Sequence, residues 1–168
     1  MFAAILSSLL IAQTSAAAST PDKDIAPFRN NPSRFFQTKD LQHIKLTIAG
    51  KHNFTVWVQD TEAKREEGMM FLEDQDFTEK QGMIFIFKQP EIQRFWMKNT
   101  FVPLDIAYIS ANGKINTALT MKEFDTTTDY SSKAPSMYVL EAKAGIFKKL
   151  GIKEGDVVRM TPLVRAKD

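Results

Sequence analysis

The chain has no cysteine among its 168 residues, and histidine occurs only twice, as His43 and His52. The absence of cysteine excludes disulfide bonds, thiolate catalysis and cysteine-ligated zinc or iron–sulfur centres. The two histidines lie at opposite ends of one expected strand, so they are too far apart to share a metal ion. No P-loop, dinucleotide-binding glycine motif or serine-hydrolase elbow occurs either. We therefore expect no metal site and no cofactor.

The chain also has little net charge. Lysine and arginine together number 22 and aspartate and glutamate 20, which leaves a formal charge of +2. Because charges of both signs are interspersed, no basic face is predicted, and we expect no nucleic-acid partner. The hydrophobic fraction of 43% is typical of one soluble domain that builds its core without disulfides.

Charged side chains are missing from the first twenty residues. A mostly apolar run over 2–12 is followed by the small residues 15–18. An apolar core of about 11 residues is too short to span a bilayer and is typical of a signal peptide, although no lysine or arginine precedes it. We predict that residues 1–18 are a signal peptide cleaved after Ala17 or Ala18, which gives a periplasmic or secreted protein with no membrane span in the mature chain. The alternative is an N-terminal arm that is disordered or touches a membrane.

Residues 19–42 contain three prolines, several charges and no sustained periodicity. This composition is typical of a linker or loose arm. Phe28, Phe35 and Phe36 can attach parts of it to the domain surface. We predict a flexible N-terminal arm over 19–42, followed by a single β-rich domain over 43–168.

Strand-like alternation begins at His43. Residues 43–48 and 54–59 flank a turn and predict an antiparallel hairpin. Asp60-Thr61 can cap a short helix that runs through Glu67, with Gly68 as a left-handed stop. Further strands are predicted over 83–87, 94–100, 105–110, 114–120, 137–142 and 157–161, and Asn112-Gly113 is a typical hairpin turn.

Short strands with only two helical segments, over 61–67 and 144–150, predict a mainly β fold. We expect a compact jelly-roll-like β-sandwich or partly closed barrel with one or two short helices. Parallel β–α–β construction is not expected, because the helices that it needs are missing.

Several motifs occur in a fixed order along the domain. They are Arg65–Met70, Gly82–Phe85, Phe95–Ile106, Tyr138–Glu141 with Ala144-Gly145, and Gly151-Ile152 with Gly155-Asp156. In this order and composition the chain resembles the bacterial and archaeal family called domain of unknown function 192, from about residue 45 to about 161. The resemblance implies a compact β-sandwich of jelly-roll kind, often behind an export signal. It implies no agreed activity, substrate or catalytic residue.

The segment from Arg94 to Thr100 carries the best candidate surface. Alternation places Arg94, Trp96, Lys98 and Thr100 on one face, and Phe95, Met97 and Asn99 on the other. An indole between two cations suits an anionic or sugar ligand, because the ring stacks and the cations pair with carboxylate or phosphate. The ligand-binding candidates are Arg65, Arg94, Trp96, Lys98, Asn99 and Thr100. The alternatives are that Trp96 is a core residue or that Asn99 and Thr100 hold a loop.

Asp105 and Glu141 are the weak catalytic candidates. Two carboxylates that meet in a cleft can perform acid–base chemistry. The structural alternative, which we favour, is that each pairs with a cation such as Arg65 or Lys98, or accepts backbone N–H bonds.

These features predict an exported, non-catalytic binding module for a small ligand, a glycan or an envelope protein. One alternative is a cell-envelope hydrolase that uses Asp105 and Glu141. The other is an envelope assembly or accessory factor that contacts its partner through a sheet edge.

Overall fold

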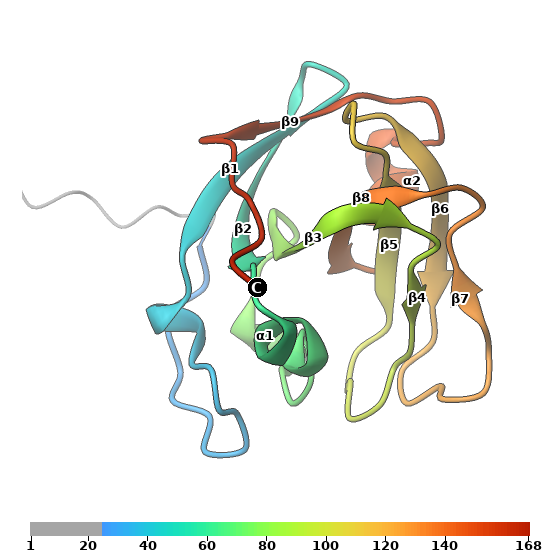
Figure 1. The fold of residues 1–168 in the computed structure, drawn as a ribbon. Coiled ribbons are helices and arrows are strands. Elements are labelled where there is room, and N and C mark those ends of the chain that lie inside the picture. Colours follow the sequence, from blue (N-terminus) through green and yellow to red (C-terminus); the bar gives the residue numbers. More distant parts are fainter. Residues whose placement is uncertain (1–24) are drawn as a thin grey trace, which may run out of the picture.

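The computed structural model describes residues 25–168. The expected signal peptide and the first residues of the arm lie outside the described residues. The described chain is mainly β and consists of one seven-stranded sheet, one two-stranded sheet and two short α-helices (Figure 1). The large sheet curls into a half-barrel, which confirms the predicted partly closed barrel with short helices.

The strands of the large sheet are, in spatial order, β6 (Ile115–Met121), β5 (Leu104–Ile109), β8 (Ser136–Lys143), β3 (Gln81–Glu91), β2 (His52–Gln59), β1 (His43–Ile48) and β9 (Val158–Thr161). The small sheet pairs β4 (Arg94–Phe95) with β7 (Tyr130–Ser131). The helices are α1 (Glu62–Glu67) and α2 (Ile146–Leu150), with 3-10 turns at Thr38–Asp40 and Asp74–Asp76. Among residues 25–168, none of these helices has the length and apolarity needed to cross a membrane.

Both predicted hairpins form. In the first, β1 pairs with β2 so that Ile44 lies opposite Val56. In the second, β5 pairs with β6 around the Asn112-Gly113 turn. Both turns are encoded locally, which is why the sequence predicts them.

One connection differs from the prediction. Strands β2 and β3 are parallel neighbours, and the crossover between them contains α1. The prediction that β–α–β construction is absent was wrong because the crossover uses loops and only a short helix. Thr61 caps α1 by accepting the Lys64 N–H, and Gly68 ends it at a φ of 45°.

Apolar side chains cover both faces of the large sheet. Val56, Ile84 and Leu140 belong to one cluster, which also includes residues of α2. Trp57, Met83 and Ile106 belong to a second cluster on the opposite face. The second cluster extends to residues after α1 and after β4, so that these loops lie over the second face of the sheet.

Candidate functional site

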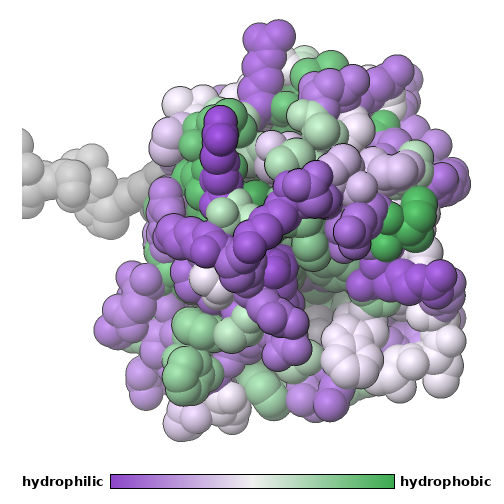
Figure 2. Space-filling model, in the orientation of Figure 1, coloured by the Kyte–Doolittle hydropathy of each residue, from purple (hydrophilic) through white to green (hydrophobic). Residues whose placement is uncertain are grey.

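Three adjoining hollows surround Trp96. The smallest and most enclosed is a cavity of about 30 Å³, and the two others are larger and more open, at about 350 and 570 Å³. All three are lined by Glu66 and Trp96. We call them together the Trp96 groove. Figure 2 shows a mixed hydrophilic and hydrophobic face with a shaded hollow below its centre.

Helix α1 forms one wall of the groove. Arg65 donates from Nη1 to the Ile86 carbonyl at 3.0 Å and pairs through Nη2 with Asp168 at 3.0 Å. Its guanidinium lies 5.1 Å from the Phe87 ring centroid. The Ile86 carbonyl and the Phe87 ring therefore hold Arg65 against β3, and the Asp168 carboxylate pairs with its guanidinium. The next residue, Glu66, is exposed.

Aromatic rings form the inner wall. Phe85 and Phe95 pack edge to face, with their centroids 4.9 Å apart. A Cβ at Gly68 would lie 3.1 Å from the Phe85 ring, so the glycine allows the end of α1 to approach this ring closely. Both Gly68 and Phe85 line the small cavity.

Trp96 lies in the loop over 96–103 and is 54% exposed. The sequence predicts a strand over 94–100, but β4 ends at Phe95. Beyond it the backbone bonds to other loops: the Met97 N–H donates to the Asp125 carbonyl at 2.8 Å. Alternation still holds over this stretch, because Met97 is buried while Trp96 and Lys98 are exposed.

The predicted alternation fails at Asn99, whose φ of 53° reverses the chain. Thr100 is consequently buried, with 4% of its surface exposed, and its hydroxyl donates to the Lys98 carbonyl. Thr100 nevertheless lines the small cavity, whereas Asn99 lines none of the three hollows. Arg94 lines one shallow hollow and pairs with Asp129 at 3.3 Å.

Lys98 occupies the mouth of the groove. Its Nζ lies 5.1 Å from the centroid of the Trp96 ring, a distance at which a cation is attracted to the ring face. The structure thus brings five of the ligand-binding candidates to the groove: Arg65, Arg94, Trp96, Lys98 and Thr100.

Glu141 lies at the floor of the small cavity. It is opposite Met83 in β3 and Ile106 in β5 and is 4% exposed. Within residues 25–168 its carboxyl makes no hydrogen bond or ion pair, contrary to the expectation of a cation or backbone partner. Burial raises the pKa of Glu141 to about 8, so that the carboxyl is mostly protonated at neutral pH.

The position of this floor depends on close strand packing. A Cβ at Gly82 would lie 2.1 Å from the backbone oxygen of Glu141. No other residue leaves room for that approach, so Gly82 fixes β8 tightly against β3.

Asp105 lies on the opposite face of the sheet. It pairs in register with Ala142, while Glu141 pairs with Ile106, so the two carboxyls point away from each other. Asp105 accepts a hydrogen bond from the Thr120 hydroxyl at 2.6 Å. Its other oxygen accepts the Phe147 N–H at 2.8 Å. The carboxylate thereby holds the start of α2, and the expectation that Asp105 accepts a backbone N–H bond is confirmed.

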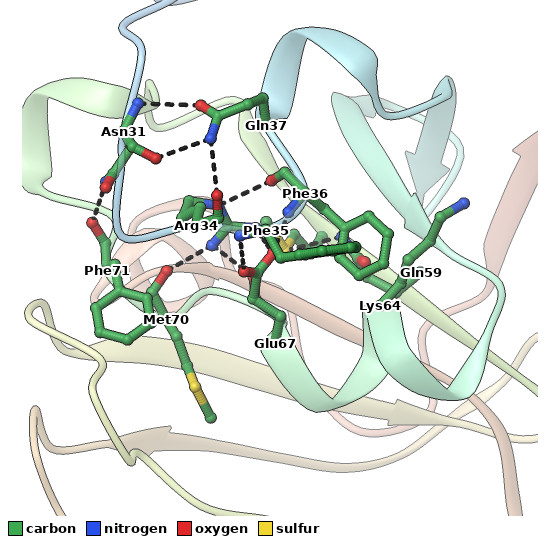
Figure 3. Close-up of polar contacts among 12 residues, drawn as sticks. Asn31, Arg34, Phe35, Phe36, Gln37, Gln59, Lys64, Glu67, Met70 and Phe71 are labelled. Carbon is green, nitrogen blue, oxygen red and sulfur yellow. Dashed lines mark hydrogen bonds and ion pairs between the residues drawn. The ribbon is translucent and has the colours of Figure 1, made fainter.

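The segment before the domain packs against the end of α1 and the residues that follow it (Figure 3). Arg34 is 5% exposed and pairs with Glu67 at 3.2 Å. Glu67 also accepts the backbone N–H groups of Phe35 and Phe36. Further acceptors of Arg34 are the carbonyls of Phe36, Gly68 and Met70. We call these contacts the arm clamp; they place Phe35 and Phe36 along the largest hollow.

Several residues that line or support the groove could not be identified from the sequence. Nothing in the local pattern marks Arg34 as buried or connects Phe35 to α1. Glu66 could have been noticed as the next residue on the helix after Arg65. Phe85 and Phe95 were assigned to strands, without any indication that their rings would meet.

The comparisons with known proteins agree with this architecture. A family model described as DUF192, Uncharacterized ACR, matches residues 44–160. A solved structure from Sinorhizobium meliloti 1021, described as a candidate transcription regulator, is 30% identical with a TM-score of 0.67 and covers 73% of this chain and 97% of its own. A protein of unknown function from Novosphingobium aromaticivorans DSM 12444 is 29% identical with a TM-score of 0.67 and covers 81% and 94%. No curated protein matches the sequence.

Proposed function

The chain belongs to the DUF192 family of uncharacterised proteins, which assigns it no activity, and we propose from the geometry of the Trp96 groove that it is a non-catalytic binding module. Its ligand stacks on Trp96 and inserts a small polar tip into the cavity above Glu141. A small molecule, a glycan or a side chain of an envelope protein has the required shape.

One observation carries this proposal: an exposed indole lies beside a cavity whose floor is a carboxyl that has no partner among residues 25–168. Leaving a buried polar group unpaired costs free energy, which a ligand hydrogen bond recovers. Aromatic stacking adds to this gain. Both terms favour the bound state, and neither requires a chemical step.

The hydrolase alternative has less support. Paired catalytic carboxylates face one bond at a separation of about 5–10 Å. Asp105 and Glu141 point to opposite faces of the sheet, and Asp105 is occupied by Thr120 and the start of α2. We therefore do not assign a reaction to them.

A ligand screen with matched variants tests the proposal. Sugars and small metabolites that raise the melting temperature of the protein are titrated against the wild type and against Trp96→Ala. We expect the variant to bind at least tenfold more weakly, about 1.4 kcal/mol. The control is Phe124→Ala, because Phe124 is equally exposed, at 58%, but lines none of the three hollows. Equal losses in both variants, or no loss in Trp96→Ala, would refute the groove as the site.

The proposed location is outside the cytoplasm. It rests on the uncharged, apolar start of the sequence followed by small residues 15–18. N-terminal sequencing of mature protein should begin after Ala17 or Ala18, and mature protein that begins at Met1 would contradict export by cleavage.

A further inference from the structure

The small cavity admits only a small group. Its volume of about 30 Å³ is above the roughly 10–15 Å³ that a single water molecule needs. The residues that line it include Phe85, Phe95 and Trp96 as well as Met69 and Met70. A hydroxyl, a methyl or an ammonium group fits this space.

Acidic side chains that have no partner in the described part of the chain favour a cationic ligand at the cavity. Glu67 is occupied by the arm clamp and Arg65 by Asp168. Glu66 and Glu141 have no ion pair or hydrogen bond within residues 25–168. Of the two cations that the described chain contributes to the cavity lining, Arg65 and Lys98, the second lies over the Trp96 ring and makes no ion pair with Glu66 or Glu141.

We propose that the cavity takes the ammonium head of a primary amine, with Glu141 as its counter-ion. The aromatic side chains that line the cavity can attract a cation, and the carboxylate accepts one of the three ammonium donors. This inference deepens the proposed function and rests on it, since the rest of the amine lies along Trp96.

Binding then involves one proton. When R–NH₃⁺ enters, the Glu141 carboxyl releases its proton to solvent, and the resulting carboxylate pairs with the ammonium. The other titratable or charged groups facing this region are Arg65, Glu66 and Glu67 from α1, Lys98 from the loop, and Tyr108 from β5. Since burial raises the pKa of Glu141, affinity increases with pH up to that pKa, by at most about tenfold per pH unit.

A set of three isosteres tests the charge requirement. The full chain is titrated with n-butylammonium, 1-butanol and butyrate, followed by calorimetry at pH 6 and pH 8. We expect n-butylammonium to bind at least tenfold more tightly than 1-butanol at pH 8, and butyrate not to bind. The affinity for n-butylammonium should rise by up to about 100-fold between the two pH values. Glucosamine compared with glucose then shows whether an amino sugar is an acceptable source of the ammonium.

Two variants test which carboxyl is the counter-ion of the ammonium group. Glu141→Gln keeps the size and hydrogen-bonding capacity of the side chain but cannot ionise, so it should lose both the tight binding and the pH dependence. Glu66→Gln is the control and should keep the pH dependence. Thermal unfolding of each variant verifies that it is folded.

The outcomes separate the two proposals. Equal binding of 1-butanol, absence of n-butylammonium binding, or an unchanged pH response in Glu141→Gln overturns the amine inference. If a neutral glycan binds to the wild type but not to Trp96→Ala, the proposed binding module is supported and the amine inference is not. If Trp96→Ala leaves the binding of every ligand intact, both proposals fail.

Discussion

The buried carboxyl of Glu141 lowers the stability of the fold at high pH. In the unfolded chain a glutamate ionises near pH 4.3, whereas burial raises the pKa of Glu141 to about 8 in the native state. Between these values the native state holds a proton that the unfolded state has lost. The free energy of unfolding therefore falls as pH rises through this window, by at most about 1.4 kcal/mol per pH unit.

Replacing this carboxyl tests that linkage. From pH 5.5 to pH 7.5 the wild type should lose about 2 kcal/mol of unfolding free energy relative to Glu141→Gln, since glutamine does not titrate. Urea unfolding of both proteins at the two pH values measures the difference. Glu66→Gln is the exposed control and should behave like the wild type. An identical pH response in Glu141→Gln and the wild type would show that Glu141 is ionised in the folded protein.

At the scale of elements, α1 depends on contacts from outside the helix. A helix of six residues is not stable alone in water. Arg65 joins it to β3 and to Asp168, and Arg34 joins its end to the arm. The wall of the groove is therefore built from three segments far apart in sequence.

Removing the arm clamp should destabilise the protein. Arg34→Met leaves Glu67 and several carbonyls without their donor, so we expect a loss of about 2–4 kcal/mol of unfolding free energy. The control Arg29→Met removes an arginine whose side chain is 54% exposed and which makes only long pairs with Glu73 and Asp76, at 3.8 and 3.7 Å; it should cost less than about 0.5 kcal/mol. Urea unfolding measures both. Similar small losses would mean that the arm adds little to the fold.

Elements encoded by neighbouring residues were predictable, and elements fixed by distant contacts were not. The Asn112-Gly113 turn and the Thr61 cap follow from local preference. The parallel pairing of β2 with β3 does not, because it depends on which strands come together across the crossover.

The candidate site was predictable to a similar extent. Period-two alternation located Trp96 and Lys98 on the exposed side, but it could not show the reversal at Asn99. The sequence shows that Glu141 is an acidic residue in an otherwise apolar strand. It does not show that β8 brings Glu141 to the same cavity as Trp96. Both omissions come from long-range packing, which has no local pattern.

At the scale of the whole molecule, the two faces of the large sheet have different roles, one in stability and the other in the proposed binding. One face packs against α2 and is secured by Asp105. The other carries the loops, the arm and the Trp96 groove. Changes at Asp105 should therefore affect stability, while changes at Trp96 should affect binding.

The two tryptophans allow a direct measurement of the central claim. Trp57 is 3% exposed and Trp96 is 54% exposed, so their indole N–H resonances report separately on the core and the groove. In ¹⁵N-labelled protein titrated with n-butylammonium, we predict that the indole signal of Trp96 and the amides of Lys98 and Glu141 shift together, while the indole of Trp57 stays in place. If compounds that raise the melting temperature leave the Trp96 signal unmoved, ligands bind elsewhere and the groove is not the site.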